Sequence, residues 1–146
     1  MEEQVRAADP NIERCERELF HRATDTVAYE SNEGGRSEIY VQSFPDRARK
    51  VQISTGGGAA PVWRGDDGRE LYFRSPGGQL MAARIASNGT QLDSDTPSVL
   101  FALPAAPNDN GMWPFAASRD GQRFLVNTVV EGASPITVLL NWKPKK

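Results

Sequence analysis

A turn made of aspartate and glycine, followed by a short apolar segment, occurs twice in this sequence and limits the folds that it can adopt. Asp67-Gly68 and Asp120-Gly121 each precede a segment rich in aromatic and aliphatic residues. Asp-Gly favours tight hairpin turns, because glycine adopts a positive φ without steric cost. The sequence therefore predicts two antiparallel β-hairpins that are built in the same way.

The same order of turn and strand extends along most of the chain. Val27, Leu71 and Phe124 begin equivalent predicted strands, and their spacing is close to the roughly 40–50 residues of one propeller blade. A β-sandwich also contains many short strands, but it does not explain this recurrence. The predicted strands are residues 27–31, 38–44, 50–55, 61–63, 70–75, 79–85, 97–103, 112–117, 123–128 and 136–142.

The first part of the chain has a different pattern. Within residues 9–23, Ile12, Cys15, Leu19 and Phe20 fall on one face of a helix, and Asp9 or Asn11 can cap its start. The sequence therefore predicts a short amphipathic helix in an N-terminal segment, residues 1–25. Its narrow apolar face needs a partner surface for stability.

The two turns belong to a longer motif that carries a family resemblance. Residues 60–73, with Trp63, Asp67, Gly68 and Tyr72, resemble the Pro-x-Trp…Asp-Gly…Leu-x-Phe/Tyr repeat of TolB-like, WD40-like β-propellers. The third repeat matches the same signature at Asp120 and Gly121, with Ala117 where the family often has tryptophan. Residues 135–142, which end on Trp142, look like the C-terminus of propellers fused to bacterial serine/threonine kinases. Trp63 and Gly68 are one residue further apart than in the family, which predicts a bulge or a longer turn.

The resemblance implies an all-β fold: a partial β-propeller of about three four-stranded blades with a short N-terminal helix. The expected blades are residues 26–58, 59–105 and 106–142. The first blade is expected to lack its innermost strand and the third its outermost strand. The family motif builds a blade, so its residues are expected to have structural roles.

Composition excludes several classes of function. The formal net charge is −2 and no basic stripe occurs, so binding to nucleic acid is not expected. No run of 18 apolar residues occurs, so membrane insertion is not expected either. The acidic N-terminus does not resemble a signal peptide, which predicts a cytoplasmic location for a complete chain. A fragment of a longer exported protein would instead be periplasmic or extracellular.

Catalytic patterns are also absent from the sequence. His21 is the only histidine, and neither a Gly-x-Ser-x-Gly motif nor a kinase signature is present. The close acidic pairs, Asp66-Asp67 and Asp93 with Asp95, are interpreted as turn residues rather than metal ligands. Gly56-Gly57-Gly58 is interpreted as a turn, because no Gly-Lys-Ser/Thr follows it. The sequence therefore predicts no enzyme activity and no catalytic, metal or cofactor site.

Three functional interpretations remain open. The first is a non-catalytic module that binds a protein or a small ligand, as the sensor end of a kinase-associated receptor. The second is an accessory propeller fragment of a prolyl-oligopeptidase-like hydrolase, and the third is a truncated relic without selected function. Unpaired strand edges at residues 27–31 and 136–142 predict a homodimer, in competition with a monomer whose helix covers its own edges.

Overall fold

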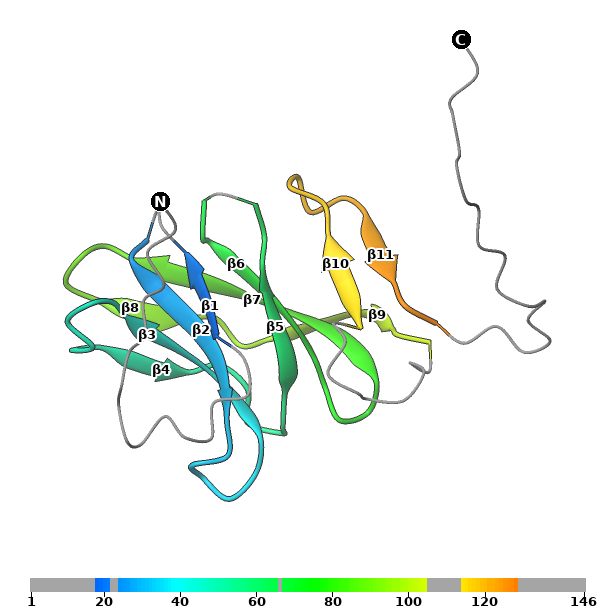
Figure 1. Cartoon of the computed structure of the whole chain (residues 1–146), viewed down its shortest axis with the longest axis horizontal. Helices are drawn as coiled ribbons and strands as arrows, with labels where there is room; N and C mark the ends of the chain where they lie inside the picture. Colours follow the sequence, from blue (N-terminus) through cyan, green and yellow to red (C-terminus); the bar gives the residue numbers. More distant parts are fainter. Residues whose placement is uncertain (1–17, 22–23, 66, 105–113, 129–146) are drawn as a thin grey trace, which may run out of the picture.

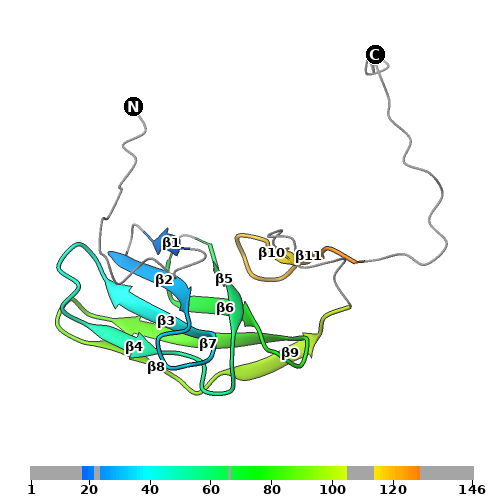
Figure 2. The same cartoon turned by 60° about the horizontal axis from the view of Figure 1, so that its bottom comes forward.

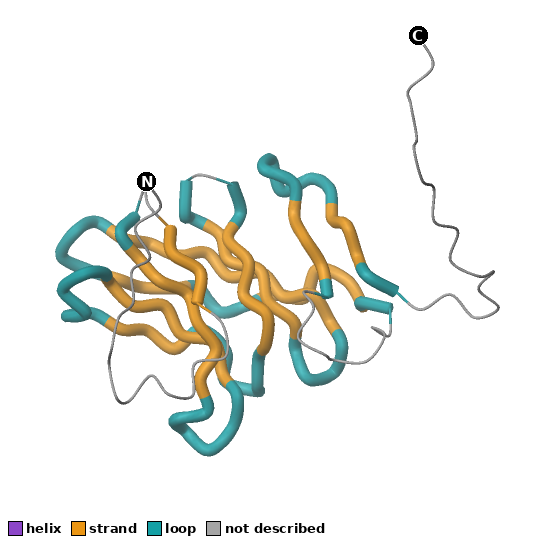
Figure 3. Tube along the Cα trace, viewed as in Figure 1, coloured by secondary structure: helices purple, strands orange, loops and turns teal. Residues whose placement is uncertain are grey.

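The computed structural model describes residues 18–21, 24–65, 67–104 and 114–128. Within these residues the chain forms β-strands joined by turns and loops, and it forms no helix (Figures 1 and 3). The strands belong to three separate groups along the sequence, and every strand pair is antiparallel. The prediction of an all-β protein is therefore confirmed.

Sheet 1 is a four-stranded meander in which each strand pairs with the next one along the chain. Short loops join its strands, so that neighbours in sequence are neighbours in the sheet. Its strands are β1 (Glu18–His21), β2 (Thr26–Ser31), β3 (Glu38–Ser43) and β4 (Lys50–Gln52).

Strand β1 corrects the prediction of an N-terminal helix. Leu19 lies opposite Ala28 and His21 lies opposite Thr26 in the ladder between β1 and β2. The helix predicted over residues 9–23 is therefore wrong at residues 18–21, and the rest of that range lies outside the described residues. An adjacent apolar pair, Leu19 and Phe20, fits a strand as well as a helix, and pairing with the edge of β2 decided the outcome. Sheet 1 thus begins at Glu18 rather than at residue 26, and its first strand is present.

Sheet 2 has an outer edge that is divided between two short strands. Strand β7 is long enough for β9 to pair with its first half and β8 with its second half. Strand β8 was not predicted, because its three residues lie in a polar stretch; Asp93 is therefore a strand residue and not a turn residue. The strands of sheet 2 are β5 (Ala59–Trp63), β6 (Glu70–Arg74), β7 (Gln79–Ser87), β8 (Leu92–Ser94) and β9 (Ser98–Ala102).

Sheet 3 is a single hairpin within the described residues. It consists of β10 (Phe115–Ala117) and β11 (Phe124–Val126), with Ala117 opposite Phe124. The predicted strand at residues 136–142 and the motif residue Trp142 lie outside the described residues.

The larger core lies between sheet 1 and sheet 2, whose strands form two layers (Figure 2). Ile39 and Val41 of sheet 1 pack with Leu71 and Phe73 of sheet 2, and all four side chains are buried. Burying a side chain of this size contributes about 1.5–3 kcal/mol relative to leaving it exposed. This core is the main hydrophobic contact between the two sheets.

A second core covers the opposite face of sheet 2. Tyr72 alternates with Leu71 and Phe73 along β6, so that its side chain points away from sheet 1 and packs with Phe115 and Phe124 of sheet 3. Sheet 2 therefore packs apolar side chains against a neighbouring sheet on each of its two faces. The first strands of the three sheets follow one another in space, since β5 contacts both β1 and β10.

Among the described residues no helix has the length and apolar character needed to cross a membrane.

Candidate functional site

The two Asp-Gly turns share one internal hydrogen bond. The Oδ1 atom of Asp67 accepts a hydrogen bond from the backbone N–H of Arg69 at 3.2 Å, and Oδ1 of Asp120 accepts one from Gln122 at 3.0 Å. Asp120 also accepts a hydrogen bond from the Ser118 hydroxyl at 2.5 Å. These hydrogen bonds, with that from Ser118 the largest cause, hold the pKa of the Asp120 carboxyl below its ordinary value. The aspartates of the motif therefore build the turns.

The second repeat has a longer turn than the third, as its sequence predicted. Trp63 pairs with Leu71, whereas Ala117 pairs with Phe124, so the turn of the second repeat encloses one more residue. Gly65 lies within this turn at a φ of 51°. Trp63 is partly buried against the larger core, and Ala117 is partly buried against the second core.

Tyr72 joins the motif of the second repeat to sheet 3. Its ring packs edge-on against Phe124 at 5.1 Å between centroids, and its hydroxyl donates a hydrogen bond to Oε2 of Glu70 at 3.1 Å. Nη1 of Arg64 donates to the same Glu70 oxygen at 2.8 Å. Burial, assisted by the negative charge of Glu70, raises the pKa of Tyr72 to about 12. Tyr72 therefore remains a neutral hydrogen-bond donor at physiological pH.

The turn between β10 and β11 packs closely against sheet 2 at two glycines, Gly65 and Gly121. A Cβ on Gly121 would lie 2.6 Å from the Tyr72 hydroxyl oxygen and 2.7 Å from Nε of Arg64. A Cβ on Gly65 would lie 2.5 Å from the backbone carbonyl oxygen of Arg119. Real Cβ atoms do not approach other atoms so closely, so a side chain at residue 65 would clash with the backbone, and one at residue 121 would force Tyr72 and Arg64 to move. The Asp-Gly motif thus serves the packing of one sheet against the next.

Sheet 1 contains a buried carboxylate that was not predicted from the sequence. Glu38 is 4% exposed, and both of its carboxylate oxygens accept a hydrogen bond from the N–H of Gly57 at 3.0 Å. The Ser54 hydroxyl and Nε of Arg36, the latter at 2.9 Å, also donate to it. The glycine triplet therefore lies in a loop, as predicted, and one of its N–H groups binds this carboxylate. A glutamate within the apolar sequence of β3 is the signal that could have identified it.

Two tyrosines and a lysine form a second cluster on sheet 1. The rings of Tyr29 and Tyr40 stack at 5.7 Å, and Nζ of Lys50 lies 4.5 Å from the centroid of Tyr40. Lys50 also forms an ion pair with Glu33. Burial lowers the pKa of Lys50, but the hydrogen bond to Glu33 and further favourable contacts outweigh it and raise the pKa. The ammonium group of Lys50 therefore lies over the aromatic surface that Tyr29 and Tyr40 form.

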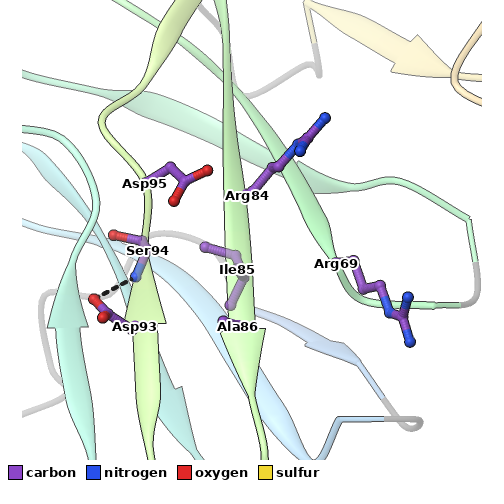
Figure 4. Close-up of a pocket in the computed structure, with 7 residues that line it drawn as sticks. All are labelled: Arg69, Arg84, Ile85, Ala86, Asp93, Ser94 and Asp95. Carbon is purple, nitrogen blue, oxygen red and sulfur yellow. Dashed lines mark hydrogen bonds between the residues drawn. The ribbon is translucent and has the colours of Figure 1, made fainter.

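An open pocket of about 280 Å³ lies on sheet 2, beside β7 and β8 (Figure 4). Arg84 belongs to β7, Asp93 belongs to β8, Asp95 directly follows β8 and Arg69 precedes β6; all four side chains are exposed. Figure 4 shows Arg84 and Asp95 on the same side, with Arg69 directed away from the two aspartates. The pocket is lined by Arg69, Arg84, Ile85, Ala86, Asp93, Ser94 and Asp95.

The pocket presents both signs of charge but no arrangement of known catalytic type. Ser94 is the hydroxyl residue in its lining, and His21, which could serve a serine as a base, belongs to β1 of another sheet. In the part of the chain that the structure describes, no three His, Cys, Asp or Glu side chains converge as metal ligands would.

Comparisons of this chain with protein-family models, with curated proteins and with solved structures find no match.

Proposed function

We propose that this chain is a segment of a β-propeller and acts as a non-catalytic binding module. The observation that carries the proposal is the burial of both faces of sheet 2 against neighbouring sheets. In a propeller every sheet packs on two neighbours, whereas each sheet of a β-sandwich packs on one neighbour and leaves its other face to solvent.

Three further observations support the propeller arrangement. Sheet 1 is a four-stranded meander, and the first strands β1, β5 and β10 contact one another in sequence order, as innermost blade strands do. The turn of sheet 3 interlocks with sheet 2 through Gly65 and Gly121. In the Asp-Gly turns of two successive sheets the aspartate accepts a hydrogen bond from the backbone N–H two residues later.

The surface that favours a binding role is the pocket beside β7 and β8. Its lining holds four exposed charged side chains together with Ile85 and Ala86. Two positive and two negative side chains suit a polar surface of a protein partner or a small zwitterionic ligand. The narrower role as the sensor end of a kinase-associated receptor rests on the resemblance of residues 135–142, which lie outside the described residues.

Site-specific photocross-linking in cells tests the binding role. A photoreactive amino acid replaces Arg84 in the pocket, and the control carries the same group at Leu125, which is 78% exposed on sheet 3. We expect one partner to be captured reproducibly at position 84, to be lost in the charge-reversal variant Asp95→Arg, and not to be captured at position 125. Equal capture at both positions, or capture unaffected by Asp95→Arg, would contradict a binding role for the pocket.

A separate assay tests the non-catalytic character. Purified protein is offered peptide, ester and nucleoside triphosphate substrates, and we expect no turnover above the background. Turnover that a single serine or histidine substitution abolishes would refute this part of the proposal.

A further inference from the structure

The turn between β7 and β8 begins with an asparagine that is followed by glycine. Asn88, Gly89 and Thr90 are all exposed, and Gly89 has a φ of 83°. The backbone nitrogen of a residue can attack the side-chain amide of an asparagine that precedes it, and glycine hinders this attack least because it has no Cβ. Asn88 and Gly89 are therefore a candidate pair for a reaction of the chain with itself.

Three donors hold the side-chain oxygen of Asn88. Its Oδ1 atom accepts hydrogen bonds from the backbone N–H of Gln91 at 2.8 Å, from the backbone N–H of Thr90 at 3.2 Å and from the Thr90 hydroxyl at 3.1 Å. Attack on Cγ places a negative charge on this oxygen. Hydrogen bonds to a charged oxygen are stronger than those to a neutral one, so the donors stabilise the tetrahedral intermediate more than the amide.

The nucleophile and the leaving group of this reaction are not held in the same way. Within the described part of the chain, neither the N–H of Gly89 nor Nδ2 of Asn88 takes part in a hydrogen bond. A Cβ at Gly89 would have nothing within 4 Å, so solvent reaches the glycine nitrogen. The turn thus fixes the oxygen that becomes charged and leaves the two reacting nitrogen atoms accessible.

The other asparagines of the described residues lack this combination. Asn32 precedes Glu33 and Asn127 precedes Thr128, and the side chain of each following residue hinders attack by its nitrogen. A second Asn-Gly pair, Asn110 and Gly111, lies outside the described residues. Because it has the same local sequence, this second pair provides an internal reference for the reaction in the unfolded chain.

We propose that Asn88 is a site of spontaneous modification, at which the chain converts this asparagine to aspartate and isoaspartate through a succinimide. The Gly89 nitrogen gives its proton to a base from the solvent and forms a bond to Cγ. The bond between Cγ and Nδ2 then breaks, and the leaving nitrogen takes up a proton and departs as ammonia.

Water completes the reaction by opening the five-membered ring at one of its two carbonyl carbons. The water oxygen bonds to that carbon, its bond to the Gly89 nitrogen breaks, and the nitrogen recovers a proton. Opening at Cγ gives aspartate, and opening at the backbone carbonyl carbon gives isoaspartate. The net change replaces an amide by a carboxylate, with water consumed and ammonia released, and no oxidant or reductant is needed.

The product carries a new negative charge next to a cation of sheet 1. Arg49, which directly precedes β4, donates a hydrogen bond from Nη1 to the backbone carbonyl oxygen of Gly89. Isoaspartate in addition lengthens the main chain of the turn by one carbon atom. The modification therefore acts where sheet 1 contacts the β7–β8 turn of sheet 2, and this inference is independent of the proposed function.

Peptide mapping of the full chain by mass spectrometry, during incubation at neutral pH, tests the proposal. Conversion raises the mass of the peptide that contains residue 88 by about one dalton, and fragmentation distinguishes isoaspartate from aspartate. Isoaspartate identifies the succinimide route, because direct hydrolysis of the amide gives aspartate alone. We expect both products at residue 88, while Asn32 and Asn127 keep their amides over the same period.

Two substitutions of Thr90 test the role of the donors. Thr90→Val removes the hydroxyl and keeps the backbone N–H, so it should slow the conversion of Asn88 about threefold. Thr90→Ser keeps a hydroxyl and should retain the wild-type rate. In urea, where the turn is lost, the rate at Asn88 should fall to that of Asn110.

Four outcomes would overturn the proposal. They are an amide that persists at Asn88, aspartate without isoaspartate, equal rates in Thr90→Val and the wild type, and a faster reaction at Asn88 in urea than in the folded chain. The last of these would mean that the hydrogen bonds of the turn protect the asparagine instead of activating it.

Discussion

The Tyr72 hydroxyl lies in the space beside Gly121, where a Cβ would be only 2.6 Å from its oxygen. Both residues belong to the repeated motif, but they come from successive repeats. Tyr72 lies on β6 of sheet 2, and Gly121 lies in the turn between β10 and β11 of sheet 3. The motif therefore joins one sheet to the next as well as building its own hairpin.

Gly121→Ala should destabilise the protein by about 2 kcal/mol, because the Tyr72 and Arg64 side chains must move aside for the new Cβ and the positive φ adds backbone strain. Gly78→Ala is the matched control. Gly78 has a φ of 75°, close to the 69° of Gly121, but nothing lies within 4 Å of its Cβ position. It should cost only about 1 kcal/mol from backbone strain. Urea denaturation measures both changes, and equal losses would exclude the steric contribution.

The raised pKa of Tyr72 predicts a loss of stability at high pH. Its pKa is about 12 in the folded protein and near the ordinary 10.0 in the unfolded chain, so the unfolded chain releases the proton first. The contribution of this group is fully present below pH 10 and decreases as the pH rises toward 12. Tyr72→Phe removes the hydrogen bond to Glu70, which should cost about 1 kcal/mol at pH 8.

The stability difference between wild type and Tyr72→Phe should therefore become smaller as the pH rises from 9 to 11.5. Urea denaturation at each pH measures it. The other tyrosines are present in both proteins and cancel in this comparison. A difference that stays constant or grows with pH would contradict the predicted burial of the hydroxyl.

Glu38→Ala should destabilise the protein by about 3 kcal/mol, because it leaves the N–H of Gly57 and the hydroxyl of Ser54 without their acceptor in a buried position. Glu33→Ala is the control, since it removes an exposed ion pair with Lys50 and should cost less than about 1 kcal/mol. Thermal unfolding followed by circular dichroism compares the two. Similar losses would mean that the loop at Gly57 does not depend on the carboxylate.

Residues 18–21 should have the NMR signature of a strand. We expect Cα and Cβ chemical shifts of extended backbone at these positions and slow amide exchange in β2, which is paired on both sides. Deletion of residues 1–21 should then accelerate exchange in β2, because one of its ladders is lost. Helical chemical shifts at residues 18–21 would contradict the structure.

Local sequence accounts for most of the strands and for the turns. Alternation and Asp-Gly signals located strands in all three sheets, and the extra residue after Trp63 correctly predicted a longer turn. These features depend on interactions between residues close in sequence, where backbone preferences of glycine and side-chain alternation act directly. Strand β8 escaped prediction because Leu92 is the one apolar residue among its three.

The all-β class, the Asp-Gly turns and the alternation that gives sheet 2 two apolar faces follow from local sequence. The strand at residues 18–21 depends on long-range pairing, because the edge of β2 offered backbone partners that outweighed helical spacing. The role of Glu38 also depended on the tertiary structure, because a buried carboxylate is stable only where distant donors such as Gly57 surround it. The close approach of Gly121 to Tyr72 likewise joins residues far apart in sequence, and such contacts form only when the sheets pack.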